Sequence, residues 1–163
     1  IQYTNRPIER GYYLRKAVCG TDPGAYMAPT EGTDPIPRES ARILKRMVRT
    51  CREQNIELVL FSLPSPANWS DAAHRAVDAL AAEMGVSYLD LNLLDLSMDW
   101  SRDTLDGGDH LNEAGAEKAS AFLGTYLAEK NTLEDKRQLP GYVRWQQDFD
   151  TFTALASAAE DTL

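Results

Sequence analysis

The stretch from Ile56 to Leu91, IELVLFSLPSPANWSDAAHRAVDALAAEMGVSYLDL, decides the fold class. It begins with a short apolar run closed by Pro64, which is typical of a strand that is covered on both faces. Ser70 then opens a helix that Gly85 ends, and residues 86–91 (VSYLDL) form a second strand. A strand, a helix and a strand in this order predict a parallel pair with a right-handed crossover, and hence an α/β protein.

Further helices are predicted on both sides of this unit. Apolar residues at helical spacing indicate one helix from Pro37 to about Asn55, one that begins at Asn112, and one from about residue 142 to residue 159. Residues 1–36 are rich in Gly, Pro, Thr, Asp and Tyr and have no period. We therefore expect an irregular amino-terminal segment at residues 1–36 and an α/β domain at residues 37–163.

Two strands are few for a sheet of this kind, which usually has about five. If further strands precede Ile1, the strand at residues 56–63 has a bare apolar edge in this chain. Bare edges recruit other chains, so this arrangement would favour a homodimer.

Composition limits the classes of function. The chain has 163 residues, a net charge of -8 and a pI near 4.7. This balance argues against nucleic acid, an anionic-membrane anchor or a polyanionic substrate, because all three need clustered Lys and Arg. No apolar run approaches about 20 residues, so no membrane segment is expected. The two cysteines, Cys19 and Cys51, lie in unlike surroundings and are expected to be unpaired.

A candidate site lies beyond the carboxyl ends of the strands, where ligands of parallel sheets bind. The loops at residues 64–69 (PSPANW) and 92–111 leave these ends, so we expect Trp69 and the DGGDH stretch at residues 106–110 to face one crevice. His110 belongs to that stretch, whereas His74 is expected on the solvent side of its helix. A carboxylate beside His110 would fix its tautomer, as a general base requires. On composition alone, the plainer interpretation is a helix-capping loop with His110 bonded to backbone.

The stretch from Leu105 to Ala116, LDGGDHLNEAGA, resembles the last block of SGNH/GDSL hydrolases. In that block an Asp shortly before a His begins the pattern His, Leu or Pro, Asn, two residues, Gly. The matching positions here are Asp106, His110, Leu111, Asn112 and Gly115. The likeness covers about residues 37–130. Over this range the order of strands, loops and helices resembles that of a largely uncharacterised bacterial group of SGNH-like proteins.

The resemblance implies a three-layer α/β/α, flavodoxin-like fold, incomplete in this chain, with serine, His and Asp chemistry on an acyl or acetyl ester. His110 would be the general base, and an aspartate would orient its imidazole. The family places that aspartate three residues before the His, where this chain has Gly107. Either a Gly-Gly bulge brings Asp106 back to His110, which we favour, or Asp109 takes the role.

The resemblance also implies a setting and a substrate class. It suggests an extracytoplasmic or cell-envelope location and a small-molecule or carbohydrate ester as substrate, and no cofactor is expected. The family carries its serine in a Gly-Asp-Ser-like block near the amino terminus, which this chain lacks, so a catalytic interpretation expects that block upstream of Ile1. Ser65 is the only serine beside the predicted crevice, and we expect it to serve the turn. Ser65 and Trp69 are the candidate substrate contacts.

Two other interpretations stay open. The chain could be a non-catalytic α/β binding or interaction domain in which Trp69 and Trp100 stack on a sugar ring, although core packing explains both tryptophans more simply. A hard-cation site could use the oxygen ligands of Asp103, Asp106 and Asp109 with His110. The spacing of these acids does not match a calcium loop, and paired cysteines for zinc are absent, so no metal is expected.

Overall fold

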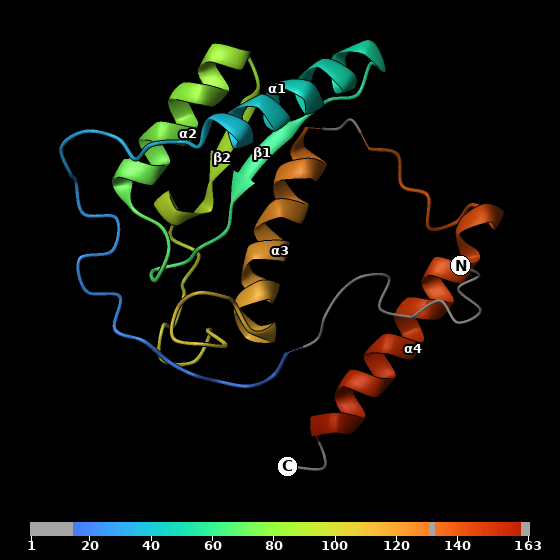
Figure 1. Cartoon of the computed structure of the whole chain (residues 1–163). Helices are drawn as coiled ribbons and strands as arrows, with labels where there is room; N and C mark the ends of the chain where they lie inside the picture. Colours follow the sequence, from blue (N-terminus) through green and yellow to red (C-terminus); the bar gives the residue numbers. More distant parts are fainter. Residues whose placement is uncertain (1–14, 131–132, 161–163) are drawn as a thin grey trace. The chain divides into compact units, whose positions relative to one another are not determined.

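The computed structural model describes residues 15–130 and 133–160 (Figure 1). Its helices and strands are, in order, α1 (Arg38–Glu53), β1 (Val59–Ser62), α2 (Asp71–Met84), β2 (Ser87–Asp90), the 3-10 turn η1 (Leu91–Leu93), α3 (Glu113–Glu129), the 3-10 turn η2 (Pro140–Tyr142) and α4 (Val143–Glu160). The two strands pair in parallel, with Val59 opposite Ser87 and Ser62 opposite Asp90. The predicted strand, helix and strand unit and the mixed α/β class are therefore confirmed.

Local signals in the sequence fix the ends of the helices. Ser70 has extended backbone before α2, and its hydroxyl accepts the Ala73 N–H at 3.1 Å. Gly85 ends α2 in the left-handed conformation, with φ 60°. Asn55 follows α1 with φ 53°. Asn112 precedes α3, and its side-chain oxygen accepts the Gly115 N–H at 3.2 Å. Each of these boundaries agrees with its prediction to within a few residues.

The described residues cluster into two compact units, one at residues 15–123 and one that includes residues 124–130 and 133–160. In the first, α2 packs on β2 and α1 packs on α2, and residues 113–123 of α3 belong to the same unit (Figure 1). Its core is small because few large side chains are fully enclosed. The buried apolar residues are Val48, Ala76, Ala81, Met84, Leu91 and Ala119.

The strand β1 differs from its prediction in one respect. Phe61 is 51% exposed, so the described residues do not cover both faces of this strand. Among these residues β1 also pairs only with β2, which leaves its other edge without a strand. The apolar run predicted a buried strand, but only one neighbouring strand is present to support it.

The amino-terminal segment supports the long loop after β2. Residues 1–14 of the predicted irregular segment lie outside the described residues, and residues 15–36 form no helix or strand. The Cys19 N–H donates to the Thr104 carbonyl at 3.0 Å, and the Thr21 N–H donates to the Trp100 carbonyl at 2.8 Å. Cys19 and Cys51 are both free thiols, as predicted.

The second unit contains α4, which agrees with the helix predicted from about residue 142 to residue 159. Two of its aromatic side chains are more than half exposed, Trp145 at 53% and Phe149 at 62%. Of the helices described, none combines the length and apolar character that crossing a membrane requires.

Candidate functional site

The DGGDH stretch forms the tip of a loop that folds back on itself. Thr104 and Leu111 form an antiparallel bridge, and the Leu105 N–H donates to the His110 carbonyl at 2.9 Å. Gly107 and Gly108 make the turn with φ 78° and 99°, a region that side chains with a Cβ rarely adopt. A Cβ on Gly108 would also lie 2.9 Å from the Thr21 Cγ2 atom. The two glycines therefore allow the backbone to return over Asp106.

This turn brings His110 onto Asp106. The Asp106 Oδ1 atom accepts the His110 backbone N–H at 2.8 Å, and Oδ2 lies 2.7 Å from the ring Nδ1. Asp109 Oδ2 is farther from Nδ1, at 3.5 Å. Of the two arrangements left open by the sequence, the ring of His110 makes its hydrogen bond with Asp106. The His110 side chain is 67% exposed, so its other ring edge is open to a substrate.

Asp106 and His110 each shift the pKa of the other. Hydrogen bonds from the backbone and ring of His110 hold the pKa of Asp106 below its usual range. The hydrogen bond to Asp106, followed by the charges of Asp109 and Asp106, raises the pKa of His110. Because an ionised carboxylate can only accept, Nδ1 carries the proton in the neutral ring. The lone pair is then on Nε2, which is the atom a general base uses.

The loops at residues 64–69 and 92–111 meet, as predicted. The Ala67 N–H donates to the Gly108 carbonyl at 3.1 Å, and the Asn68 amide donates to the Asp109 carboxylate. The Ser65 hydroxyl donates to the carbonyls of Gly108 and Asp109 at 3.1 and 3.0 Å. Ser65 therefore ties the loops together. Within the described ranges, no serine hydroxyl hydrogen-bonds the His110 ring.

Beneath these loops lies a buried polar cluster that the sequence analysis missed. Asp90 ends β2, and its side chain is 1% exposed. Its carboxylate accepts from Trp69 Nε1 at 2.9 Å, from the Tyr88 hydroxyl at 3.1 Å and from the Asn92 backbone N–H at 2.9 Å, and it pairs with His74 Nδ1 at 2.8 Å. The indole N–H of Trp69 is therefore engaged by Asp90.

The placement of His74 on the solvent side of α2 was wrong. Its side chain is 19% exposed and stacks on Tyr88, with ring centroids 5.8 Å apart. His74 lies seven residues, or about two turns, before Ala81, which is 1% exposed, so both lie on the packed face of the helix. One signal for this cluster was present in the sequence, because Asp90 is a carboxylate at the end of a predicted strand.

Burial and hydrogen bonding act in opposite directions in this cluster. Desolvation raises the pKa of Asp90, but hydrogen bonds from Asn92, Trp69 and His74 outweigh it, and the pKa lies below its usual range. Desolvation raises the pKa of the Tyr88 hydroxyl. Desolvation likewise raises the pKa of Tyr26 to about 12. Asp90 is thus an ionised carboxylate that organises several hydrogen-bond donors around it.

A cavity of about 160 Å³ lies beside this cluster, at the carboxyl ends of the strands. Its lining includes Tyr26, Pro64, Asn92 and Trp100. Tyr26 and Trp100 pack edge to face, with ring centroids 5.5 Å apart. Trp100 therefore lines a cavity, whereas core packing was the simpler expectation.

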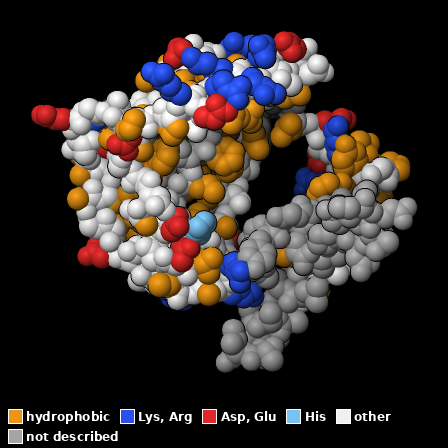
Figure 2. All heavy atoms as spheres, in the orientation of Figure 1, with side chains coloured by type: hydrophobic (Ala, Val, Ile, Leu, Met, Phe, Trp, Pro, Cys, Tyr) orange, Lys and Arg blue, Asp and Glu red, His pale blue; other side chains and the backbone are white. Residues whose placement is uncertain are grey.

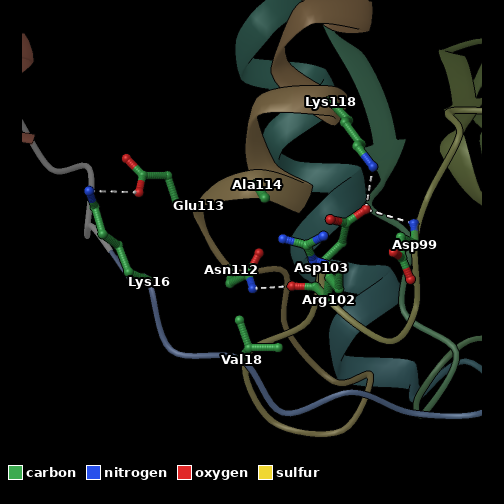
Figure 3. Close-up of a pocket in the computed structure, with 9 residues that line it drawn as sticks. All are labelled: Lys16, Val18, Asp99, Arg102, Asp103, Asn112, Glu113, Ala114 and Lys118. Atoms are coloured by element: carbon green, nitrogen blue, oxygen red, sulfur yellow. Dashed lines mark hydrogen bonds and ion pairs between the residues drawn. The ribbon is translucent and has the colours of Figure 1, made fainter. Parts of the chain in front are cut away.

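A larger cavity, of about 340 Å³, lies at the start of α3 (Figure 3). Its charged side chains pair across it, with Lys118 on Asp103 at 2.5 Å and Lys16 on Glu113 at 3.6 Å. His110 is not among the residues that line it. This cavity is therefore separate from the Asp106–His110 pair.

A metal could bind only part of the set that the sequence suggested. Asp106, Asp109 and His110 offer ligand atoms within 4.8 Å of one another, and they are the one such group in the described residues. Asp103 is 3% exposed, and its carboxylate accepts the Asp99 N–H at 2.7 Å and binds Lys118. It does not belong to the group.

Comparisons with protein families, with curated proteins and with solved structures find no match to this chain. The geometry of the site is therefore the basis for a functional proposal.

Proposed function

We propose that this chain carries the general-base pair of an SGNH/GDSL-type ester hydrolase or acyltransferase, on a three-layer α/β/α fold. The observation that carries the proposal is the 2.7 Å contact between Asp106 Oδ2 and His110 Nδ1. It supplies the two features that a catalytic histidine needs, an oriented ring and a stabilised imidazolium. The loop that holds it meets the loop that leaves β1.

The chemistry follows from the ring tautomer. His110 Nε2 takes the proton of a serine hydroxyl while the serine oxygen attacks the acyl carbon of an ester. The tetrahedral intermediate then expels the alcohol, which receives the proton from Nε2, and leaves an acyl-enzyme. Water or an acceptor alcohol repeats the sequence and regenerates the serine. Asp106 stays ionised throughout and stabilises the imidazolium.

The substrate class is an acyl or acetyl ester of a small molecule or carbohydrate, in an extracytoplasmic or cell-envelope setting. The substrate class and the setting both rest on the resemblance at residues 105–116. Asp109 acts as a supporting charge in this scheme, since it lies 3.5 Å from Nδ1 and also accepts from Asn68. Ser65 serves as the tie between the loops.

A second candidate is a non-catalytic carbohydrate-binding domain. The observation that favours it is the cavity of about 160 Å³ lined by Trp100 and Tyr26, since an aromatic wall suits stacking on a sugar ring. It requires no serine beside His110. Titration with acetylated and free sugars, followed by tryptophan fluorescence, would support it if binding disappears in Trp100→Ala and persists in His110→Ala.

Covalent labelling tests the hydrolase proposal. A fluorophosphonate reacts with a serine only when a neighbouring base activates it. The gene's full product should be labelled on one serine, identified by peptide mass spectrometry, and labelling should fall by about 10² or more in His110→Ala. His74→Gln, which changes the other histidine, is the matched control and should be labelled as wild type when folded. Absence of labelling in the folded wild-type protein would refute the proposal.

A further inference from the structure

We propose that α1 docks this protein on an anionic lipid bilayer through a basic face. We define this basic face as Arg38, Arg42, Lys45, Arg46, Arg49 and Arg52. These six residues and two glutamates give the helix a net charge of +4, whereas the whole chain carries -8. The inference is independent of the proposed esterase activity.

The spacing puts the six cations on one side of the helix. Successive members are one, three or four residues apart, which keeps them within about a third of the helix circumference. Val48, which is 4% exposed, lies on the flank of the helix that packs on the protein, whereas Ile43 and Met47, on the side opposite the cations, are 48% and 50% exposed. Figure 2 shows Lys and Arg side chains gathered at the edge of the molecule where Figure 1 places α1. The basic face therefore points outward.

Five of the six cations are accessible and weakly engaged, whereas Arg52 donates to the Met84 carbonyl at the end of α2. The side chains of Arg42, Lys45 and Arg49 are 60%, 51% and 69% exposed. Their partners are glutamates that are themselves more than 60% exposed, and such surface ion pairs exchange readily for other anions. Arg38 and Arg46 make no side-chain ion pair within the part of the chain that is described.

A groove beside the basic face offers a place for a headgroup. It has a volume of about 470 Å³ and lies between α1 and the end of α2. Lys45, Arg49 and Arg52 line it together with Glu53 and Glu83. A lipid phosphate between these cations would bring negative charge to three basic groups at once.

A bilayer fits this surface better than a polymeric anion does. The helix is about 24 Å long, and its cations form a convex stripe that can touch many headgroups of a planar surface at once. Clusters of four to eight Lys and Arg on an amphipathic helix are typical of anionic-lipid binding. Electrostatic attraction acts over about 10 Å at 0.1 M salt, so the acidic remainder of the chain does not cancel a local contact.

Vesicle co-sedimentation of the 163-residue chain tests the proposal. We expect the protein to sediment with vesicles of phosphatidylglycerol and phosphatidylcholine in equal parts, and to stay in solution with phosphatidylcholine alone. In the triple variant Arg38→Gln, Arg46→Gln, Arg49→Gln, affinity should fall by at least about tenfold. The triple lysine variant at these positions keeps the charge and should bind like wild type.

The matched control removes the same charge from elsewhere. The variant Lys130→Gln, Lys136→Gln, Arg144→Gln has the same net charge as the α1 glutamine variant and should bind within about twofold of wild type. Circular dichroism of each variant establishes that it is folded. Equal loss in the two glutamine variants, or no binding of the wild type to the anionic vesicles, would overturn the proposal. So would retention on heparin without vesicle binding, which would indicate a polymeric anion.

Discussion

Replacing Asp90 with alanine should destabilise the protein by at least about 3 kcal/mol. The carboxylate is nearly completely buried and accepts from several donors. After its removal Tyr88 can still bond Ser62, and the Asn92 amide can still bond the Leu63 carbonyl. Trp69 Nε1, His74 Nδ1 and the Asn92 backbone N–H have no such substitute within the described cluster, and a buried donor left unsatisfied costs about 1 to 3 kcal/mol. Three such donors, at about 1 kcal/mol or more each, give the expected minimum.

Urea unfolding followed by far-UV circular dichroism measures this loss of stability. Asp109→Ala is the matched control, because its carboxylate is 45% exposed, and it should change stability by less than about 0.5 kcal/mol. Asp90→Asn should fall between the two variants because the amide keeps one acceptor oxygen. A change of less than about 0.5 kcal/mol in Asp90→Ala would refute the account of the cluster.

The pH dependence of stability offers a further check on Asp90. Its pKa lies below the unfolded value of about 3.9, so its contribution is present above that value and is lost as the pH falls through the lower folded pKa. Wild type should therefore lose more stability than Asp90→Asn on acidification below about pH 4. An equal loss of stability in wild type and Asp90→Asn would mean that the pKa of the Asp90 carboxyl is the same in the folded and unfolded protein.

Three further results are expected. Gly108→Ala should cost about 1 to 3 kcal/mol in urea unfolding, because of its φ of 99° and the contact with Thr21; no loss would contradict the predicted turn. If His110 is the base, activity should rise with pH through a pKa above the usual 6.5, because the imidazolium must first lose its proton. In Asp106→Asn this rise in activity should occur at a lower pH. If the rise in activity occurs at the same pH in Asp106→Asn as in wild type, the group that titrates is not His110. Ultraviolet titration should find a tyrosine near pH 12 that is missing in Tyr26→Phe, and an unchanged titration in this variant would refute the burial argument.

The sequence predicted the elements that local chemistry decides. Ser70 and Gly85 begin and end α2 because a hydroxyl cap and a left-handed residue act within a few residues of chain. The parallel pairing of β1 and β2 followed from the connection between them. The meeting of the loops at residues 64–69 and 92–111 followed in turn, because carboxyl ends of parallel strands lie at one edge.

Predictions from the sequence were wrong where contacts between distant elements determine the position of a side chain. His74 is polar, so it was assigned to solvent, yet a buried carboxylate on the next strand gives it a partner. No spacing rule reveals that Asp90 accepts from a helix, a loop and its own strand at once. Likewise, the apolar run of β1 indicated burial, but coverage depends on which neighbours are present.

The net charge of the whole chain did not predict the basic face of α1. The whole-chain value of -8 argued against anionic partners, but it averages over a helix that carries six cations on one face. Electrostatic interactions at physiological salt reach only about 8 Å, so the local distribution decides what each surface attracts. Counting charges separately for each predicted helix would have singled out residues 38–53 from the sequence.

The most direct test of the central claim is hydrolysis of p-nitrophenyl acetate and acetylated sugars by the gene's full product. The account predicts turnover that falls by about 10² to 10⁴ in His110→Ala, falls in Asp106→Asn, and changes little in Asp109→Asn. Turnover by wild type that survives in His110→Ala, or a folded wild-type protein that hydrolyses none of these esters, would contradict it.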